Sequence, residues 1–420
     1  MTPWSPVIVV GGGQAGLSMS YCLKQRGIDH LVLERDCVAS DWRTRRWDSF
    51  CLVTPNWQCQ LPGFPYSAHD PDGFMGRDEI VGYIEAYAAS FGPPLLEGVA
   101  VESLRRHPDG GFELTTSAGE MHPPQVIIAT GGYHVPRIPR FAEALPPAIE
   151  QLHSSQYRNA EALPDGDVLI VGTGQSGCQI AEDLHLAGRQ VHLCVGGATR
   201  TARSYRGRDV VAWLDDLRYY DMPVHEHKLG EGVRAKANQY VTGRGGGRDI
   251  DLRRFASEGM SLYGRLTGAR DGVMTFAADL VGNLDRADAA CEAIKDTIDA
   301  HIDEHGIEAP AEPRYTAVWE PSDEPRELDL TRAWIGSIVW ATGFESDYRW
   351  VELPVFDGIG RLVHGRGVTA APGLYVIGLP WLYTWGSGRF SGVARDAEYL
   401  ADLVELGQDN LVVDALARGA

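Results

Sequence analysis

The sequence predicts an α/β protein built from two Rossmann-like dinucleotide-binding domains, with the second domain inserted into the first. A GxGxxG glycine motif follows the first apolar run, and the same unit recurs in the middle of the chain. Two other apolar runs each end in the tripeptide ATG. We expect a first domain in two parts, residues 1–162 and 335–420, and an inserted domain at residues 163–334.

The first motif has the strand and helix context that dinucleotide binding requires. The strand-like run Val7–Val10 leads into Gly11, Gly13 and Gly16, and a helical pattern follows. The first glycine makes the turn, the second lets the backbone approach a diphosphate, and the third lets helix and strand pack closely. The next apolar run ends at Glu34, where a carboxylate can bind a ribose hydroxyl. The alternative is an ordinary glycine turn with Glu34 at a solvated strand end.

The second motif predicts a site for a different dinucleotide. Its glycines have the same spacing, at Gly172, Gly174 and Gly177. Val195 stands at the position equivalent to Glu34, and Arg200 and Arg203 follow it. Because a carboxylate would repel a 2′-phosphate and arginines would bind it, we expect FAD at the first motif and NADP(H) at the second. If Arg200 binds the 2′-phosphate, its replacement by alanine should weaken NADPH binding far more than NADH binding. The alternative is that both arginines are solvated loop charges.

The remaining segments complete the two domains. Each ATG, at residues 129–131 and 341–343, is expected to end a strand where the chain crosses between domains. The last apolar run ends at Gly378, and a helix with one apolar face (Val393, Ala397, Leu400, Ala401 and Val404) should return to the first domain. Residues 205–330, with a helix expected at 280–304, should shape the substrate side.

We expect cofactor contacts from these turns and from the charged cluster that begins at Arg43, although that cluster is equally consistent with a solvated loop. The expected cofactor-binding residues are Gly11, Gly13, Gln14, Ala15, Gly16, Glu34, Arg35, Trp42, Arg43, Thr130, Gly131, Gly172, Gly174, Gln175, Ser176, Gly177, Arg200, Arg203, Thr342, Gly343 and Gly378.

Composition narrows the function classes. A formal net charge of -19 argues against nucleic-acid and anionic-membrane partners, which leaves small-molecule chemistry. The seven cysteines are scattered without a CxxC pair, so neither a disulfide framework nor a redox dithiol is indicated. No metal-spaced cluster and no nucleophile triad is recognisable. Without an apolar run long enough to span a membrane or a leader segment, we expect a cytoplasmic protein.

Several segments together resemble the flavin-containing monooxygenase superfamily, especially bacterial flavoproteins related to the plant flavin monooxygenases of auxin synthesis. The resemblance covers nearly the whole chain. Besides the glycine and ATG motifs it includes WDSFCLVTP at 47–55, QLPGFPY at 60–66, HSSQYR at 153–158 and GLYVIG at 373–378. Two departures are that Pro147 and Ile149 replace a phenylalanine and a glycine of the linker signature, and that Gln175 replaces an asparagine.

The resemblance implies an NADPH-dependent monooxygenase. Its bound FAD would form a C4a-hydroperoxyflavin with dioxygen and oxygenate a nitrogen, sulfur or activated carbon of a small molecule. It also implies a catalytic role for Asn56, for which a turn residue is the alternative. His153 and Tyr157 lie in the linker to the second domain, where they would serve domain coupling or coenzyme contact, and a structural histidine is the alternative for His153. An NAD(P)H-dependent reductase or dehydrogenase with another acceptor is the second hypothesis, and a nonenzymatic flavin-binding protein is the third. The substrate and the oligomeric state are not predicted.

Overall fold

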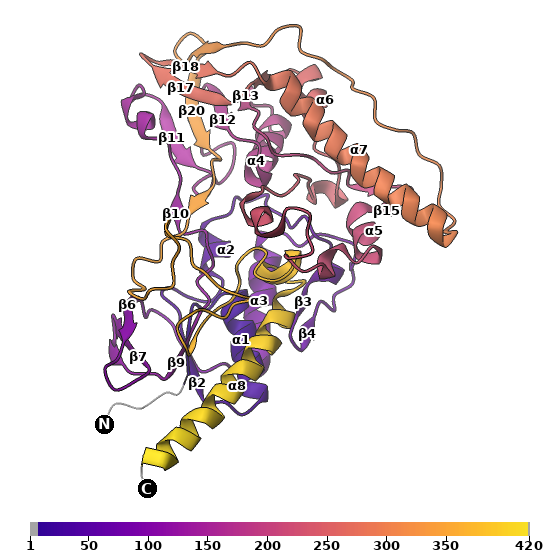
Figure 1. The fold of residues 1–420 in the computed structure, drawn as a ribbon. Helices are drawn as coiled ribbons and strands as arrows, with labels where there is room; N and C mark the ends of the chain where they lie inside the picture. The colour runs from indigo at the N-terminus through magenta and orange to yellow at the C-terminus, as the bar shows by residue number, and fades with distance from the viewer. Residues whose placement is uncertain (1–6, 419–420) are drawn as a thin grey trace.

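The computed structural model describes residues 7–418, with side chains through residue 407, and each of its two lobes contains a five-stranded parallel sheet (Figure 1). The first sheet has the order β22-β9-β1-β2-β5. Its strands are β1 (Val7–Val10), β2 (His30–Leu33), β5 (Leu95–Leu96), β9 (Gln125–Ile128) and β22 (Leu374–Val376).

Helices cover this sheet because its strands are apolar on both faces. All four side chains of β1 are buried, as expected of a central strand in a parallel sheet. Helix α1 (Gln14–Gln25) follows β1, and α3 (Arg77–Phe91) and α8 (Val393–Arg418) pack in the same hydrophobic cluster. The predicted apolar face of the last helix, from Val393 to Val404, is fully buried in that cluster, so its place on the first lobe is confirmed.

The second sheet repeats the arrangement of the first. Its order is β11-β20-β12-β13-β16, and every pairing is parallel. The strands are β11 (Glu150–His153), β12 (Asp167–Val171), β13 (Val191–Cys194), β16 (Ser261–Tyr263) and β20 (Ile335–Trp340). Helix α4 (Gln175–Leu186) follows β12 as α1 follows β1. The helix expected at 280–304 is confirmed as α7 (Leu280–His305).

Shorter elements surround the two sheets. The first lobe adds α2 (Ser40–Thr44), the hairpin β3 (Gln60–Leu61) and β4 (Phe64–Pro65), and the meander β6 (Val101–Arg106), β7 (Phe112–Thr116) and β8 (Gly119–Met121). The second lobe adds α5 (Val210–Asp216), α6 (Leu252–Ser257), β14 (Ser204–Tyr205), β15 (Arg208–Asp209), β17 (Leu266–Arg270), β18 (Val273–Phe276) and β19 (Glu327–Asp329). Short 3-10 helices lie at Asn56–Gln58, Arg140–Ala144, Tyr219–Asp221, Gly230–Ala235, Arg244–Gly246 and Trp385–Gly388.

The chain crosses between the lobes at two adjacent connections. β10 (Val135–Pro136) and β21 (Phe344–Glu345) form an antiparallel pair at the junction seen in Figure 1. Strands β11 and β20 belong to the second sheet, although the expected boundaries assigned residues 150–162 and 335–340 to the first domain. Strand pairing therefore corrects those assignments, and we propose boundaries at the β10 and β21 connections.

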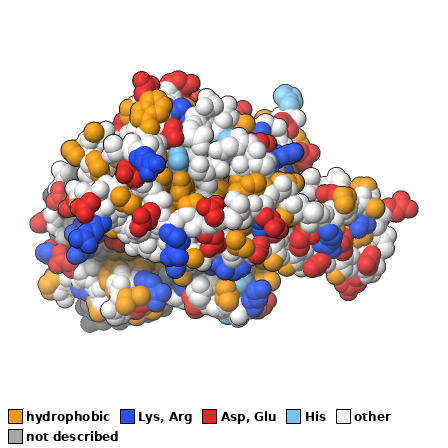
Figure 2. All heavy atoms as spheres, turned by 90° about the horizontal axis from the view of Figure 1, so that it is seen from above, with side chains coloured by type: hydrophobic (Ala, Val, Ile, Leu, Met, Phe, Trp, Pro, Cys, Tyr) orange, Lys and Arg blue, Asp and Glu red, His pale blue; other side chains and the backbone are white. Residues whose placement is uncertain are grey.

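The distribution of charged side chains on the surface is consistent with the acidic composition of the chain. On the face seen in Figure 2, acidic side chains are spread over the surface and mixed with basic ones. Within residues 7–418, no helix is long and apolar enough to cross a membrane.

Candidate active site

A cavity of about 610 Å³ opens at the carboxyl edge of the first sheet. Because the strands are parallel, the residues that follow β1, β2, β9 and β22 converge on this edge. Ten predicted cofactor-binding residues line the cavity: Gly11, Gly13, Gln14, Ala15, Glu34, Arg35, Trp42, Thr130, Gly131 and Gly378. The sheet order places Glu34 toward one end and Gly378 toward the other.

The first glycine turn fits a diphosphate. Gly11 has a φ of +112°, and a Cβ there would lie 2.7 Å from the Ala129 carbonyl oxygen. A Cβ on Gly16 would lie 1.8 Å from the Gly11 carbonyl oxygen, so Gly16 serves packing and not lining. A Cβ on Gly13 would meet no described atom within 4 Å. Gly13 is the N-cap of helix α1, and no described side chain caps this helix, so its first N–H groups are available to an anion.

Glu34 is held in place at the ribose end of the turn. Its Oε2 accepts a hydrogen bond from the Gly12 N–H at 2.6 Å, and its Oε1 accepts one from the Asp36 N–H at 2.9 Å. A carboxylate fixed by two backbone donors beside a cavity can also accept from ribose hydroxyls. The geometry therefore fits the adenosine half of FAD.

Arginines gather at the opposite end of the cavity. Arg45, Arg46 and Arg389 line it, and burial lowers the pKa of the Arg46 and Arg389 guanidiniums below the ordinary value. Neither of these two forms a salt bridge with any acidic group in the described part of the chain, and the Arg389 guanidinium lies 3.6 Å from the Trp385 ring centroid. Arginine keeps its charge under burial. This end therefore favours a negatively charged group.

Arg43 lies outside the lining of this cavity. Arg43 forms an ion pair with Glu85 on α3 and is not among the residues that line the cavity. Helix α2 ends at Thr44, and the chain beyond it directs Arg45 and Arg46 to the cavity instead. The sequence alone does not specify which arginine of the RTRRW segment faces the cavity.

The second glycine turn has the same geometry as the first. Gly172 has a φ of +107°, and its Cβ would lie 2.7 Å from the Ala341 carbonyl oxygen. A Cβ on Gly177 would lie 2.0 Å from the Gly172 carbonyl oxygen, whereas one on Gly174 would meet no described atom within 4 Å. Gly174 is likewise the N-cap of helix α4, and no described side chain caps that helix. The turn therefore presents a second helix N-terminus to an anion.

Comparison with known proteins agrees with the presence of two dinucleotide-binding turns. Residues 8–241 match the family model described as pyridine nucleotide-disulphide oxidoreductase. The chain belongs to that family. It is therefore an enzyme, an oxidoreductase.

Individual relatives extend the likeness over the whole chain. An uncharacterized CzcO-like oxidoreductase of Geobacillus kaustophilus is 32% identical over 94% of this chain and 96% of its own. The indole-3-pyruvate monooxygenase YUCCA1 of Oryza sativa subsp. japonica is 34% identical over 46% of this chain and 48% of its own. The flavin-containing monooxygenase of Stenotrophomonas maltophilia shares the fold, with a TM-score of 0.64 and 19% identity over 95% of this chain and 98% of that one. The resemblance stated from the motifs is thus confirmed.

Arg200 and Arg203 do not lie free beside the second turn of this oxidoreductase. Arg200 is 3% exposed, with its Nε 2.7 Å from Asp288 Oδ1 and its guanidinium over the Tyr315 ring. Arg203 donates to the Val53 carbonyl oxygen at 2.7 Å and pairs with Asp209. Both are buried structural cations, so the structure supports neither the 2′-phosphate role nor the solvated alternative.

The other predicted residues of the second site have mixed placements. The Gln175 amide donates to the Val241 carbonyl oxygen, and Ser176 is half-buried beside it in the first turn of α4. Thr342 donates to the Arg137 carbonyl oxygen, and the Gly343 carbonyl oxygen accepts from the Arg137 N–H at 2.9 Å. Thr342 and Gly343 therefore hold the β10–β21 junction.

Asn56 occupies a buried loop and does not line the cavity. Its Nδ2 donates to the Asp70 carbonyl oxygen at 2.9 Å, and its Oδ1 accepts from the Met75 N–H at 2.8 Å. The side chain is 4% exposed. Because both ends of the amide are used to fix the chain, the structure favours the turn-residue alternative over a catalytic role.

His153 and Tyr157 are both fully buried, and each takes part in a hydrogen bond near a contact between the lobes. The Tyr157 hydroxyl donates to Asp183 Oδ2 of α4 at 2.6 Å, and Ser49 of the first lobe donates to the other oxygen of that carboxylate at 2.6 Å. Burial, with the hydrogen bond to Asp183, raises the pKa of Tyr157. His153 Nε2 lies 2.9 Å from the Gly343 carbonyl oxygen at the junction.

A segment of the second lobe contacts the loop that leads to Arg389. The Val224 N–H donates to the Tyr383 carbonyl oxygen at 2.7 Å, and the Tyr220 and Trp385 rings pack with centroids 4.6 Å apart. Trp381 is 4% exposed and packs in this contact rather than lining the cavity. The aromatic residues therefore serve mainly as packing that shields Arg389.

Proposed function

We propose that this oxidoreductase is an FAD- and NADPH-dependent monooxygenase that transfers one oxygen atom of dioxygen to a small molecule. The observation that carries the proposal is the pair of matching glycine turns, each at the carboxyl edge of a parallel sheet. Each turn is followed by a helix whose N-terminus is not capped by any described side chain. Two such turns serve one enzyme when one dinucleotide stays bound and the other delivers electrons to it. The likeness to a plant indole-3-pyruvate monooxygenase supports oxygen as the acceptor.

FAD would lie along the cavity, held by a carboxylate and by backbone N–H groups. The Glu34 carboxylate would accept from the ribose hydroxyls, and the first N–H groups of α1 would face the diphosphate across Gly13. When bound, the flavin supplies the hydride acceptor and the site of oxygen activation. The ring would lie toward Gly378 and Arg389, because these residues line the end of the cavity opposite Glu34.

Protein groups at this inner end control charge and water. Arg46 and Arg389 bring positive charge that no described acidic side chain neutralises by an ion pair, so they stabilise negative charge on a cofactor or substrate there. The packed aromatic pair Tyr220 and Trp385 limits the access of water to Arg389. A water-poor, positively charged site strengthens electrostatic interactions during the reaction.

The test is anaerobic reduction followed by reoxidation. Purified FAD-loaded protein is mixed with NADPH or NADH while the visible flavin absorbance is followed, and the reduced protein is then mixed rapidly with dioxygen. We expect fast bleaching by NADPH and a transient near-ultraviolet band before the oxidised spectrum returns. Bleaching without the transient would instead support the reductase or dehydrogenase hypothesis. Absence of bleaching by either coenzyme would refute the assignment of the second turn.

The state of the cysteines indicates the cellular compartment in which the enzyme works. All seven cysteines are free in the structure, and six of them are buried. Unpaired thiols are typical of reducing compartments, so we propose that the enzyme works in the cytoplasm, which cell fractionation would test.

A further inference from the structure

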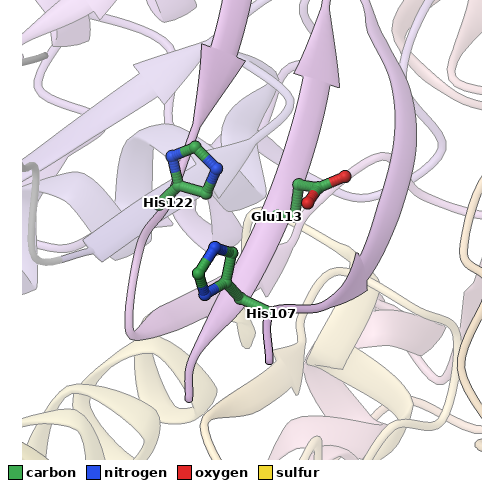
Figure 3. Close-up of side chains that lie close together, drawn as sticks. All are labelled: His107, Glu113 and His122. Carbon is green, nitrogen blue, oxygen red and sulfur yellow. The ribbon is translucent and has the colours of Figure 1, made fainter. Parts of the chain in front are cut away.

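The meander of β6, β7 and β8 brings together three metal-ligating side chains that the cofactor turns do not use. His107 follows β6 directly, Glu113 lies in β7, and His122 follows β8 directly. One ligand atom from each residue lies within 4.8 Å of the other two. Figure 3 shows the two imidazole rings next to each other, with Glu113 on the strand beside them.

Strand register explains why these residues meet. Glu113 pairs with Arg105 across the β6–β7 ladder, and the next pair on β7, Leu114 with Met121, sets His122 opposite Glu113. His107, two residues beyond Arg105, lies on the same face because side chains alternate along a strand. The opposite face of the meander is apolar and packs in the core of the first lobe. The cluster is therefore fixed by the backbone and lies on the solvent side.

The ligand groups are available. No described residue forms a hydrogen bond or ion pair with the Glu113 carboxylate or with the His122 ring, and the two histidine rings pack edge to face with centroids 4.8 Å apart. Arg105, the nearest cation across the ladder, is engaged by both oxygens of Glu352 at 2.8 and 2.6 Å. The guanidinium therefore does not neutralise Glu113 by an ion pair.

We propose that His107, Glu113 and His122 bind a divalent transition-metal ion of the zinc type, with water completing the coordination. Two imidazole nitrogens and one carboxylate oxygen suit Zn²⁺ and its neighbours rather than Mg²⁺ or Ca²⁺, which prefer oxygen ligands alone. Zinc bonds of about 2.0–2.2 Å require ligand atoms roughly 3.3 Å apart. Rotation of the exposed His122 and the half-buried Glu113 closes the remaining gap.

The Asp109 carboxylate lies close enough to His107 to orient its ring. Asp109 Oδ2 lies 4.0 Å from His107 Nδ1, which accepts a 3.2 Å hydrogen bond from the Asp109 N–H in the absence of metal. When Nε2 binds the ion, Nδ1 carries the proton, and this N–H would donate a hydrogen bond to the Asp109 carboxylate. Such outer carboxylates fix the tautomer of a metal-bound histidine.

Metal binding here would tie the outer ends of three strands together. β6 begins at Val101, which lines the dinucleotide cavity, and it ends beside His107. An ion that binds the folded meander and not the unfolded chain raises the thermal midpoint of unfolding. The site is independent of the proposed oxygenase activity, because it needs neither coenzyme nor substrate.

Zinc titration of the FAD-loaded, tag-free, full-length protein tests the site. We expect isothermal titration calorimetry to show one Zn²⁺ ion bound per chain at this site, with binding weakened at least about tenfold by His107→Ala or by His122→Ala. Glu113→Gln, which keeps the shape and removes the charge, should weaken it as well. These side chains are exposed or half-buried, so circular dichroism should report an unchanged fold.

Competing ligands elsewhere on the chain provide the control. His301 and His305 lie one helical turn apart on α7 with ring centroids 4.3 Å apart, and Cys37 is an exposed thiol. The triple variant His301→Ala, His305→Ala, Cys37→Ser should keep wild-type affinity for the proposed ion. Binding that survives both meander variants, or that disappears only in the triple variant, would overturn the proposal.

Discussion

Replacing Gly174 by alanine should separate coenzyme binding from folding. A Cβ at this position would meet no described atom within 4 Å. The backbone there, with φ −64° and ψ 176°, is a conformation that alanine adopts readily. The added methyl group would project into the space before the N-terminus of α4, where we expect the coenzyme diphosphate. The substitution therefore acts on the ligand and not on the protein.

The expected effect of Gly174→Ala on stability and on NADPH binding can be estimated from three contributions. Gly174 is the N-cap of α4, where alanine is less favourable than glycine by about 0.5–1 kcal/mol. Alanine restricts the unfolded chain and returns about 0.4–1 kcal/mol, so the stability of the free protein should change little. In the complex, a methyl group forced against the diphosphate costs about 1–3 kcal/mol. That range corresponds to a Kd for NADPH about 5- to 150-fold weaker.

Anaerobic stopped-flow reduction measures this effect. The dependence of the bleaching rate on NADPH concentration gives the Kd, while FAD content and Tm report folding. Gly13→Ala is the matched control, because a Cβ there is equally unobstructed and it should lower FAD retention instead. If Gly174→Ala binds NADPH within twofold of wild type, α4 does not hold the coenzyme. If it loses FAD and Gly13→Ala does not, the two assignments are reversed.

Three further predictions concern single residues. Glu34→Ala removes the acceptor for two backbone N–H groups and for ribose, so fluorescence titration should show FAD binding weaker by about 1.5–3 kcal/mol, and unchanged affinity would refute the ribose role. Arg200→Ala leaves Arg253 as the remaining ion-pair partner of Asp288, and loss of one partner of a buried pair costs up to about 3–5 kcal/mol. Tm should therefore fall while the NADPH-to-NADH preference stays constant, and a changed preference would restore the 2′-phosphate role. Burial raises the pKa of Asp396 from 3.8 to about 6, so its contribution is favourable below pH 3.8 and is lost as pH rises through 6. Asp396→Asn should therefore be more stable than wild type at pH 8, by up to about 3 kcal/mol, and similar near pH 4; equal Tm differences at both pH values would contradict the burial argument.

Local sequence patterns were sufficient for the elements that carry the glycine turns. Apolar runs such as Val7–Val10 form central strands because burial on both faces demands continuous apolar side chains. The apolar spacing of the last helix identified its buried face for the same reason. Both features depend on neighbours close in sequence, which is why they are readable without a structure.

Features set by distant partners were not readable. β11 and β20 pair with each other across the inserted segment, so the lobe to which they belong depends on tertiary contacts. The sequence shows that Arg200 is charged, but its partner Asp288 comes from α7, far along the chain. The sequence offers Asn56 as a catalytic amide, but only the structure shows that its side chain is hydrogen-bonded to the Asp70 and Met75 backbones. The metal-ligand cluster on the meander likewise requires strand register, since its three spacings match no recognised motif.

The two ATG segments show how a nucleotide-binding turn is specified by residues far apart in the chain. Ala129 lies under the first turn, 3.4 Å from where a Cβ of Gly16 would stand, and Ala341 lies 3.0 Å from the corresponding point of Gly177. A larger side chain at either alanine would push the helix start away from the turn and misplace its N–H groups. The small residue after β9 or β20 is thus as much part of the turn as its glycines, and this contact accounts for the alanine of each ATG.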